Sequence, residues 1–314
     1  DALGAIARAR QVVVVGDSKQ LPPTSFFSRL SEDTDDSSDD IENDGNFLEE
    51  VESVLGLCSG VFKNNLMLRW HYRSQHPGLI AVSNRNFYEN KLLLPPSVLR
   101  AKSSSSLGVS LIPSPPNGYQ RGGPDGGRNV LEAELIAKEV INFARTSPDK
   151  SLGVAAFSVK QRDAIRDLID EYRSKNSDLE PFFSITKDEP FFVKNLESIQ
   201  GDERDVIFIS VGYGRDTDGR LTQAFGPLGI DGGERRLNVL ISRAKERCTV
   251  FSSITAQDIQ PVAGKLGVNA FREFLQFAQS GYFDVPINTG RDFDSEFEES
   301  VALFLISSGF TVEP

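Results

Sequence analysis

The sequence predicts an α/β fold in which a parallel β-sheet carries helices on both faces. Short apolar runs, rich in β-branched residues, predict buried strands at residues 12–15, 152–157, 206–211 and 248–251. Between these runs lie segments whose apolar residues recur at helical spacing. Strands that alternate with helices in this way form parallel sheets, because each helix returns the chain to the same end of the sheet.

The helices are predicted from apolar residues at intervals of three and four positions. They span residues 77–88, 130–143, 159–172 and 234–243. Residues 66–68 predict one more short strand, and the glycine- and proline-rich residues 113–128 predict a loop. Because ligands bind at the carboxyl ends of the strands in such sheets, we expect a site near the loop 16–20, the turn 158–161 and the loop after Val211.

Length and composition set the limits of the interpretation. The chain has 314 residues, so one complete domain and parts of others are expected. Its 39% hydrophobic and 25% charged residues are ordinary for a globular protein. No apolar run is long enough to cross a bilayer, and no signal-peptide pattern opens the sequence. The chain begins at Asp1 and its only methionine is Met67, which predicts an internal fragment of a longer protein.

The acidic residues are concentrated in one stretch. Residues 31–52 contain eleven acidic residues and no lysine or arginine, which accounts for the whole net charge of −11. The rest of the chain has 34 acidic and 34 basic residues and is neutral. The stretch predicts a solvated, flexible insert, and a mimic of nucleic acid that shields a binding groove is the alternative. The net charge therefore does not exclude nucleic-acid binding.

Cysteine and histidine are too sparse for a disulfide framework or a zinc site. The two cysteines are Cys58 and Cys248, and the apolar neighbours of Cys248 predict a buried free thiol. A reducing cytoplasm fits this usage. The two histidines, His71 and His76, have no cysteine or aspartate pair nearby, so no metal site is predicted.

Two polar strings are not needed for a core. They are GDSKQLPP at residues 16–23 and RRLNVLISRAKER at 235–247. The second is expected to place Arg243 and Arg247 one helical turn apart at the end of a helix, and both strings predict part of a phosphate-handling site. No G-x-x-x-x-G-K-[ST] string occurs, and no strand is followed by Asp-Glu, so the phosphate cradle of a P-loop is missing.

These strings and three others resemble, in the same order, the motifs of superfamily 1 helicases, in the branch typified by the RNA helicase of nonsense-mediated decay. They are GDSKQLPP at 16–23 (motif III), HYRSQHPGLIAVSNRNFYENKL at 71–92 (the Q-Y-R-x-H-P segment), LGVAAFSVKQRDAI at 152–165 (motif IV), LESIQGDERDVIFIS at 196–210 (motif V) and RRLNVLISRAKER at 235–247 (motif VI). The resemblance covers most of the chain. It implies an AAA-type ATP-dependent helicase and a RecA-like, P-loop NTPase-type sheet, here a second motor domain truncated at both ends.

The Q-Y-R-x-H-P segment departs from the family pattern. His71 stands where the family has glutamine, and Ser74-Gln75 replaces its methionine, which adds one residue. Arg73 still matches the family's arginine.

The resemblance implies catalytic and ATP-binding roles for four residues. Arg243 resembles the arginine finger, Arg73 a second phosphate-contacting arginine, and Gln20 the glutamine that senses the γ-phosphate. Glu203 resembles the motif V glutamate near the ribose or the attacking water. Phosphoryl transfer depends on positioning and on positive charge at the transferring phosphate, which arginine supplies. ATP and Mg²⁺ are the implied cofactors, with the Mg²⁺ ligands outside this chain.

Each of these residues also has a structural alternative. Arg243 would cap its helix and pair with Glu246. Arg73 would be a surface arginine, Gln20 a turn residue, and Glu203 part of a polar turn.

Single-stranded nucleic acid, DNA or RNA, is the implied partner. Its expected contacts are Ser158, Lys160 and Gln161 after the motif IV strand, and Ser198 and Gln200 in motif V, with Asn84 as a further candidate. Tyr72 or His71 would stack on the base, and packing is the alternative. Binding should be salt-sensitive.

The expected organisation has four parts. Residues 1–30 would end a first RecA-like domain, 31–60 would be an acidic connector, 61–285 the second RecA-like domain, and 286–314 the start of a restriction-endonuclease-like domain. In that last part Glu298 would help to hold a metal, and an amphipathic helix with an acidic start is the alternative. The fragment alone is predicted to be inactive. The rival functions are a regulatory part of a metal-dependent nuclease and an inactive helicase-fold binding module.

Overall fold

The computed structural model describes residues 2–21, 54–62, 65–94, 108–122, 126–216, 218–281, 300–302 and 304. The chain divides into two compact units, Asp1–Gly281 and Tyr282–Pro314. The acidic stretch 31–52 and Glu298 lie outside the described residues. All described strands belong to the first unit.

A five-stranded parallel sheet forms the centre of this unit, in the order β1-β7-β6-β4-β5. Its strands are β1 (Gly108–Pro113), β4 (Leu152–Ala156), β5 (Phe192–Asn195), β6 (Arg204–Ser210) and β7 (Ala244–Ser252). The short strands β2 (Tyr119–Gln120) and β3 (Arg128–Asn129) pair separately and antiparallel. The predicted α/β class with a RecA-like parallel sheet is confirmed.

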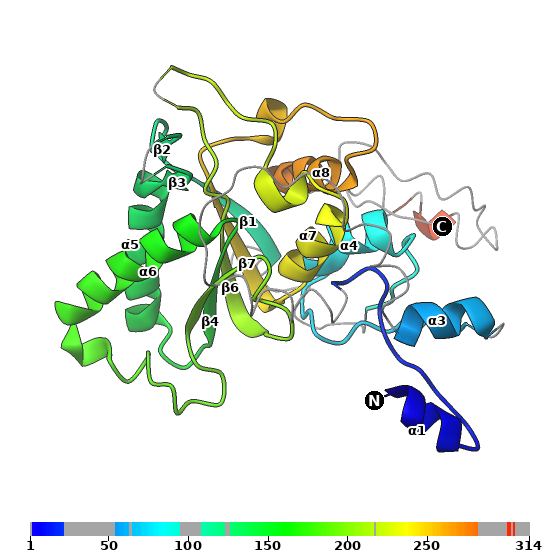
Figure 1. The fold of residues 1–314 in the computed structure, drawn as a ribbon. Coiled ribbons are helices and arrows are strands. Elements are labelled where there is room, and N and C mark those ends of the chain that lie inside the picture. Colours follow the sequence, from blue (N-terminus) through cyan, green and yellow to red (C-terminus); the bar gives the residue numbers. More distant parts are fainter. Residues whose placement is uncertain are drawn as a thin grey trace. The chain divides into compact units, whose positions relative to one another are not determined.

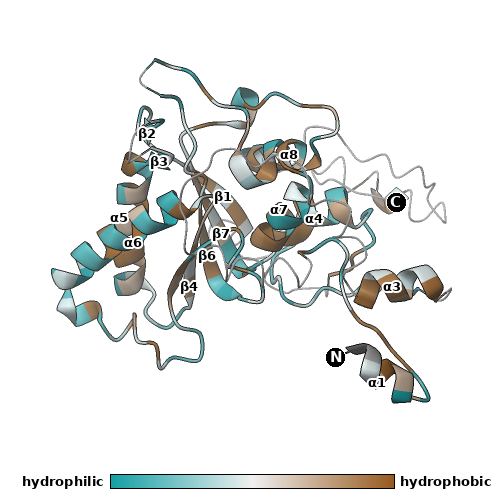
Figure 2. Cartoon of the chain, viewed as in Figure 1, coloured by the Kyte–Doolittle hydropathy of each residue, from teal (hydrophilic) through white to brown (hydrophobic). Residues whose placement is uncertain are grey.

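Helices cover both faces of the sheet, as Figure 1 shows. On one face lie α5 (Val130–Thr146) and α6 (Val159–Ser174), and on the other lie α4 (Gly78–Phe87), α7 (Gly233–Ile241) and α8 (Leu266–Ser280). The first unit also contains α1 (Ala2–Arg8), α3 (Val54–Val61) and the 3₁₀ turns η2 (Ser177–Leu179), η3 (Gly226–Leu228) and η4 (Ala256–Asp258). In Figure 2 the central strands are mainly brown, while teal dominates α6. No described helix has the length and apolar character needed to span a membrane.

The polar loops before α5 and α6 fix where these helices begin. Asn129 accepts a hydrogen bond from the Glu132 amide at 3.1 Å, and Ser158 accepts one from the Gln161 amide at 3.1 Å. Past these caps, both helices bury an apolar stripe against β4 and β6, and Ile165 of α6 is fully buried. Each such side chain contributes about 1.5–3 kcal/mol by leaving water. The caps therefore place the polar first turns of α5 and α6 beside the carboxyl ends of the strands.

Most predicted elements are confirmed, with small shifts at their ends. The helix predicted over 234–243 ends at Ile241, so Arg243 follows α7 and Arg247 lies inside β7. The expected spacing of one helical turn between these arginines is therefore wrong. The elements β1, β5 and α8 were not predicted.

The strands predicted at 12–15 and 66–68 do not form. Neither run pairs with a strand within the described part of the chain, where Trp70 and Leu93 make an isolated bridge. Val13 and Val15 are 76% and 75% exposed, because no sheet covers them. The loop 16–20 consequently does not follow the end of a strand, and its position has to be explained by other contacts.

The prediction for Cys248 is confirmed. It is a buried free thiol in β7, and burial raises its pKa to about 12. Cys58 is also free and is half-buried.

Candidate functional site

The predicted phosphate-site residues Gln20, Arg73, Glu203 and Arg243 come together at the amino ends of two neighbouring strands. Glu203 directly precedes β6 and Arg243 directly precedes β7, and the first residues of these strands lie opposite each other. Gln20 and Arg73 reach the same place from distant parts of the sequence. We refer to these four residues as the arginine cluster. It lies at the edge of the sheet opposite to the one expected from the strand order.

Arg243 is the buried member of the arginine cluster. Its guanidinium donates to the carbonyl oxygen of Val239 at 2.7 Å, to Ser242 Oγ at 3.3 Å and to Gln20 Oε1 at 3.4 Å. Burial, and next the charge of Arg73, lower the pKa of Arg243 to about 10, so it remains a cation at neutral pH. The alternative pairing with Glu246 does not occur, because Glu246 pairs with Lys150 at 2.5 Å.

Arg73 and Glu203 form the half-exposed part of the cluster. Arg73 Nε donates to Glu203 Oε2 at 2.6 Å, and Nη1 donates to the carbonyl oxygen of Ser242 at 3.3 Å. The hydrogen bond from Arg73 lowers the pKa of Glu203, which is therefore a carboxylate at neutral pH. The segment that carries Arg73 is fixed to the sheet, since the Gln75 amide donates to the Lys245 carbonyl at 2.7 Å.

Lys245 adds a third cation beside the cluster. Its Nζ lies 3.8 Å from Glu203 Oε1 and forms an ion pair with Glu189. Arg73, Arg243 and Lys245 thus lie near the carboxylates of Glu203 and Glu189, and a third carboxylate, that of Asp17, is bonded to Gln20. The guanidinium groups, rather than an excess of charge, are what such a site offers to a phosphate.

The residues flanking Arg73 differ in their exposure. His71 Nε2 lies 2.8 Å from Ser74 Oγ, and burial together with the charges of Arg73 and Arg243 lowers the pKa of His71 to about 4. His71 is therefore neutral and engaged within the fold. Tyr72 is 75% exposed, and its ring is stacked with Trp70 at a centroid distance of 6.4 Å. Of the two predicted base-stacking residues, Tyr72 has the accessible ring.

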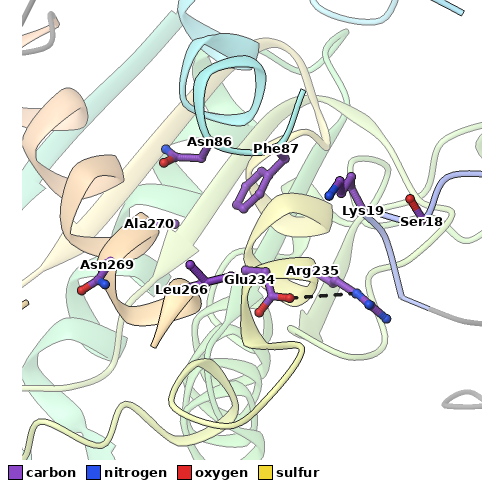
Figure 3. A pocket seen from close by; sticks show the side chains of 9 residues that line it. All are labelled: Ser18, Lys19, Asn86, Phe87, Glu234, Arg235, Leu266, Asn269 and Ala270. Atoms are coloured by element: carbon purple, nitrogen blue, oxygen red, sulfur yellow. Dashed lines mark ion pairs between the residues drawn. The ribbon is translucent and has the colours of Figure 1, made fainter. Parts of the chain in front are cut away.

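The loop that carries Gln20 borders a small cavity. The cavity has a volume of about 190 Å³ and lies between this loop, α4, α7 and α8. In Figure 3, Lys19 and Phe87 line it from above, and Glu234 forms an ion pair with Arg235 at its lower side. The loop is thus seated beside α4 and α7.

Two predicted nucleic-acid contacts lie at the carboxyl end of β4, and a third does not face solvent. Ser158 caps α6 and donates to the Gly127 carbonyl at 3.4 Å, and Lys160 is exposed. Gln161 is fully buried: it accepts from the Asn129 amide at 2.7 Å and donates to Ser210 Oγ at 3.0 Å. The Gln161 side chain is not accessible to nucleic acid, so the expected contact at Gln161 is corrected.

The remaining predicted nucleic-acid contacts differ in their exposure and in their hydrogen bonds within the protein. Ser198 follows β5 and is exposed. Gln200 is exposed, but its Nε2 donates to the Leu21 carbonyl at 3.1 Å and so faces the loop of the arginine cluster. The expected contact between Asn84 and nucleic acid is corrected. The Asn84 side chain instead makes two hydrogen bonds with the backbone of Leu92, at 3.0 and 3.2 Å, and closes the turn after α4.

A second polar group lies at the carboxyl edge of the sheet, and we call it the buried network. It joins α5, α6 and β6 through side chains that are fully buried, namely Asn129, Glu132, Gln161 and Ser210. Glu132 Oε1 accepts hydrogen bonds from Ser210 Oγ and from the Gly212 amide, both at 2.7 Å. Burial nevertheless raises the pKa of Glu132 to about 7.

Comparison with known families assigns the chain to one of them. The model of a family described as "AAA domain" matches residues 52–255, a range that contains Arg73, Glu203 and Arg243. The chain belongs to this family. The AAA-domain match also includes the whole five-stranded sheet and the helices α4 to α7.

Two curated relatives of this AAA-domain chain are helicases by name. It is 32% identical over 292 residues to "Uncharacterized ATP-dependent helicase MG140" of Mycoplasma genitalium (strain ATCC 33530 / DSM 19775 / NCTC 10195 / G37). It is 30% identical over 292 residues to the homolog of that protein in Mycoplasma pneumoniae (strain ATCC 29342 / M129 / Subtype 1). Each match covers 89% of this chain and 24% of the relative. The chain thus spans about a quarter of the length of these relatives.

One solved structure is similar at a low level. It is the C-terminal domain of a possible DNA helicase from Lactobacillus plantarum WCFS1, with a TM-score of 0.31 and 11% identity over 62% of this chain and 91% of that one. A likeness of this size supports no conclusion about fold or activity.

The arginine cluster of this AAA-domain chain has side chains of the kind that hold phosphate oxygens. The arginine cluster supplies buried and half-exposed guanidinium groups, which suit phosphate oxygens. Among the described residues no group of three or more His, Cys, Asp or Glu side chains is arranged to hold a metal ion. The described residues therefore offer guanidinium groups that suit a phosphate.

Sequence reasoning missed residues that hold the arginine cluster in place. Lys245 and Asn238 lie within the motif VI string, and Tyr88 lies within the string at 71–92. Alternation along β7 could have indicated Lys245, which follows Arg243 by two positions. No sequence signal marks Tyr88 or Asn238, because their contacts join parts of the chain that are 71 and 219 positions apart.

Proposed function

We propose that this chain is part of an ATP-dependent superfamily 1 DNA or RNA helicase or translocase. In this proposal Arg243 is the arginine finger, Gln20 the γ-phosphate sensor, and Arg73 the second arginine on the phosphate chain. The observation that carries the proposal is the 3.4 Å contact between Arg243 and Gln20, which are 223 positions apart. The similarity to proteins named ATP-dependent helicases supports it.

The cluster would act by placing charge and by exchanging partners. Arg243 is already oriented by its bond to Val239, so little reorganisation is needed when a phosphate arrives. Arg73 is held by Glu203 and would move to the phosphate oxygens, while the nearby Lys245 balances the released carboxylate. Bound ATP and Mg²⁺ would supply the phosphoryl group and its counter-charge, with the Mg²⁺ ligands outside this chain.

Single-stranded nucleic acid would bind at the opposite, carboxyl edge of the sheet. Ser158, Lys160 and Ser198 are the contacts that support this part of the proposal, because they follow β4 and β5 and face solvent or cap α6. Hydroxyl and lysine contacts of this kind hold phosphate and sugar without reading the base sequence. Residues 61–285 would form the second motor domain, working in the cytoplasm, and residues 286–314 would begin an appended domain.

The arginine-finger assignment is tested in a full-length protein that contains this chain. Arg243→Ala should lower ATP turnover by roughly 10³–10⁵, because an arginine finger stabilises the transition state by that factor. Steady-state phosphate release measures the loss, and circular dichroism measures folding.

Arg247→Ala is the matched control for this test. Arg247 lies in β7, with its guanidinium 5.9 Å from the Phe143 ring on the α5 side of the sheet. Turnover per folded molecule should therefore stay within a few-fold of wild type. Equal losses in both variants, or Arg243→Ala activity near wild type, would refute the assignment.

A further inference from the structure

The loop formed by residues 17–21 has its own internal order. Asp17 Oδ1 accepts a hydrogen bond from the Lys19 amide at 2.9 Å, and Oδ2 accepts one from Gln20 Nε2 at 2.8 Å. The Gln20 amide also donates to the Asp17 carbonyl at 3.3 Å. These bonds close a tight turn. Because the loop is in no strand, its attachment to the rest of the molecule depends on side chains outside it.

Tyr88 and Asn238 attach the loop at Asp17 and Lys19, and Gln200 adds the bond to the Leu21 carbonyl at 3.1 Å. Tyr88 Oη donates to Asp17 Oδ2 at 2.7 Å and accepts from Asn238 Nδ2 at 2.9 Å. Asn238 Nδ2 also donates to the Lys19 carbonyl at 2.8 Å. Tyr88 directly follows α4, and Asn238 lies in α7 and is 1% exposed. One side chain just after α4 and one within α7 therefore bind the loop, at Asp17 and at Lys19.

The hydrogen bond from Tyr88 to Asp17 is retained at neutral pH. Burial raises the pKa of Tyr88, and the hydrogen bond to Asp17 raises it further. The Tyr88 hydroxyl consequently keeps its proton and donates to the Asp17 carboxylate. A charge-assisted hydrogen bond of this type is stronger than a neutral one.

The same contacts orient the amide of Gln20. Its Nε2 shares Asp17 Oδ2 with the Tyr88 hydroxyl, so its Oε1 points the other way and accepts from Arg243 Nη2. Asn238 lies one helical turn before Ser242, whose hydroxyl donates to the Asn238 carbonyl at 2.8 Å. Asn238, which binds the loop, thus lies within one helical turn of Val239 and Ser242, which accept hydrogen bonds from Arg243.

We propose that Tyr88 and Asn238 are positioning residues that latch the 17–21 loop onto α7 and thereby hold Gln20 against Arg243. Neither residue touches the nucleotide in this proposal, which rests on the proposed function. Loss of the latch would let Gln20 and Arg243 separate, and the phosphate sensor would no longer be aligned with the arginine finger.

The first test measures the attachment directly, by hydrogen exchange on the chain with this sequence. Tyr88→Phe removes the hydroxyl and keeps the ring, and it should speed exchange of the amides of residues 17–21 by about tenfold. Exchange in β6 and β7 should not change.

Two controls belong to this test. Tyr119→Phe removes a hydroxyl beside Tyr213, away from the loop. Lys19→Ala removes a side chain that lines the cavity in Figure 3 but keeps the backbone carbonyl that Asn238 binds. Both should leave exchange of residues 17–21 unchanged. Wild-type exchange in Tyr88→Phe would overturn the latch.

The second test uses ATP turnover in a full-length protein that contains the chain. Tyr88→Phe should lower kcat about tenfold with little change in KM, because it disturbs alignment rather than binding. Combined with Gln20→Ala, it should cause no further loss, since both act through the same amide. A merely structural role would instead lower Tm and leave kcat per folded molecule unchanged.

The outcomes separate the latch from the proposed function. Slow turnover in Gln20→Ala and Arg243→Ala, with wild-type kcat in Tyr88→Phe, would overturn the latch and leave the proposed function standing. A full-length protein without any ATP turnover would overturn the proposed function and the alignment role together, and hydrogen exchange would then still decide whether Tyr88 attaches the loop.

Discussion

The two edges of the central sheet hold polar residues in opposite ways. At the amino edge, Arg73 and Glu203 form an ion pair whose side chains are 31% and 41% exposed, with Lys245 within reach of the same carboxylate. At the carboxyl edge, the Gln161 and Glu132 side chains of the buried network are fully enclosed. The Arg73–Glu203 pair is thus charged and close to water, whereas the buried network is enclosed and joined by hydrogen bonds.

This difference separates residues that can change partners from residues that cannot. A half-exposed ion pair contributes no more than about 1 kcal/mol to stability, so an incoming phosphate can replace Glu203 at Arg73 at small cost. A buried polar group that loses its partner costs about 1–3 kcal/mol. The buried network therefore fixes how α5 and α6 meet the sheet, whereas the arginine cluster can respond to a ligand.

The largest effect is expected at the amino edge. Arg73→Ala in a full-length protein should reduce ATP turnover by roughly 10²–10³, as expected for loss of one group that stabilises charge in the transition state. The free energy of unfolding should change by less than about 1 kcal/mol. Steady-state turnover and urea denaturation measure the two effects.

Arg162→Ala is the control for Arg73, since Arg162 on α6 is 24% exposed and pairs with Asp163 at 2.8 Å. Arg162→Ala should change neither ATP turnover nor the free energy of unfolding much. A large stability loss in Arg73→Ala with intact turnover would mean that the amino edge serves the fold.

An intermediate effect is expected from Glu132, through pH. Its pKa is raised by burial from 4.5 to about 7 in the folded state. Between these values the unfolded chain loses the proton that the folded chain keeps, so the free energy of unfolding falls as pH rises, by up to about 3 kcal/mol. Glu132→Gln has no such proton and should lose this slope.

Urea denaturation at about pH 5 and about pH 8 measures the slope. Glu134→Gln is the matched control, because Glu134 is on the same helix and pairs with Lys138 at the surface. It should keep the wild-type dependence. A slope that persists in Glu132→Gln would show that another group titrates in this range.

The smallest effect is expected from Lys160 at the outer rim of the carboxyl edge. Lys160→Ala should weaken single-stranded nucleic-acid binding a few-fold and reduce the slope of log affinity against log salt by about 0.7. Fluorescence anisotropy at several salt concentrations measures both. Lys138→Ala on α5 removes an equal charge and should not change the slope, and equal slopes in both variants would argue against a contact at Lys160.

The regular part of the fold could be predicted because local patterns decide it. β4 is a continuous apolar run, and β6 and β7 contain such a run in their later part, while α5 and α6 begin at polar caps and keep one apolar stripe. The run at 12–15 has the same local pattern and fails as a strand, because pairing depends on a neighbour that local sequence does not reveal. The short β5 was missed since lysine and asparagine fill half of it. The helix α8 was missed although its apolar residues recur at helical spacing.

The site was predictable as a set of residues but not as a geometry. The motif resemblance selected Gln20, Arg73, Glu203 and Arg243, and these four lie together. It could not distinguish exposed from buried members of a motif, as Gln161 demonstrates. Burial is decided by packing between elements, which a motif does not describe.

The exposed run at residues 12–15 also affects how the purified chain behaves in solution. Val13 and Val15 are 76% and 75% exposed on an extended, uncharged backbone stretch, and extended runs of this kind pair edge to edge with copies of themselves. Arg8 and Arg10 stand just before the run and oppose such pairing by charge repulsion. High salt screens that repulsion. The chain should therefore aggregate more readily as ionic strength rises, and low-salt buffers suit its purification.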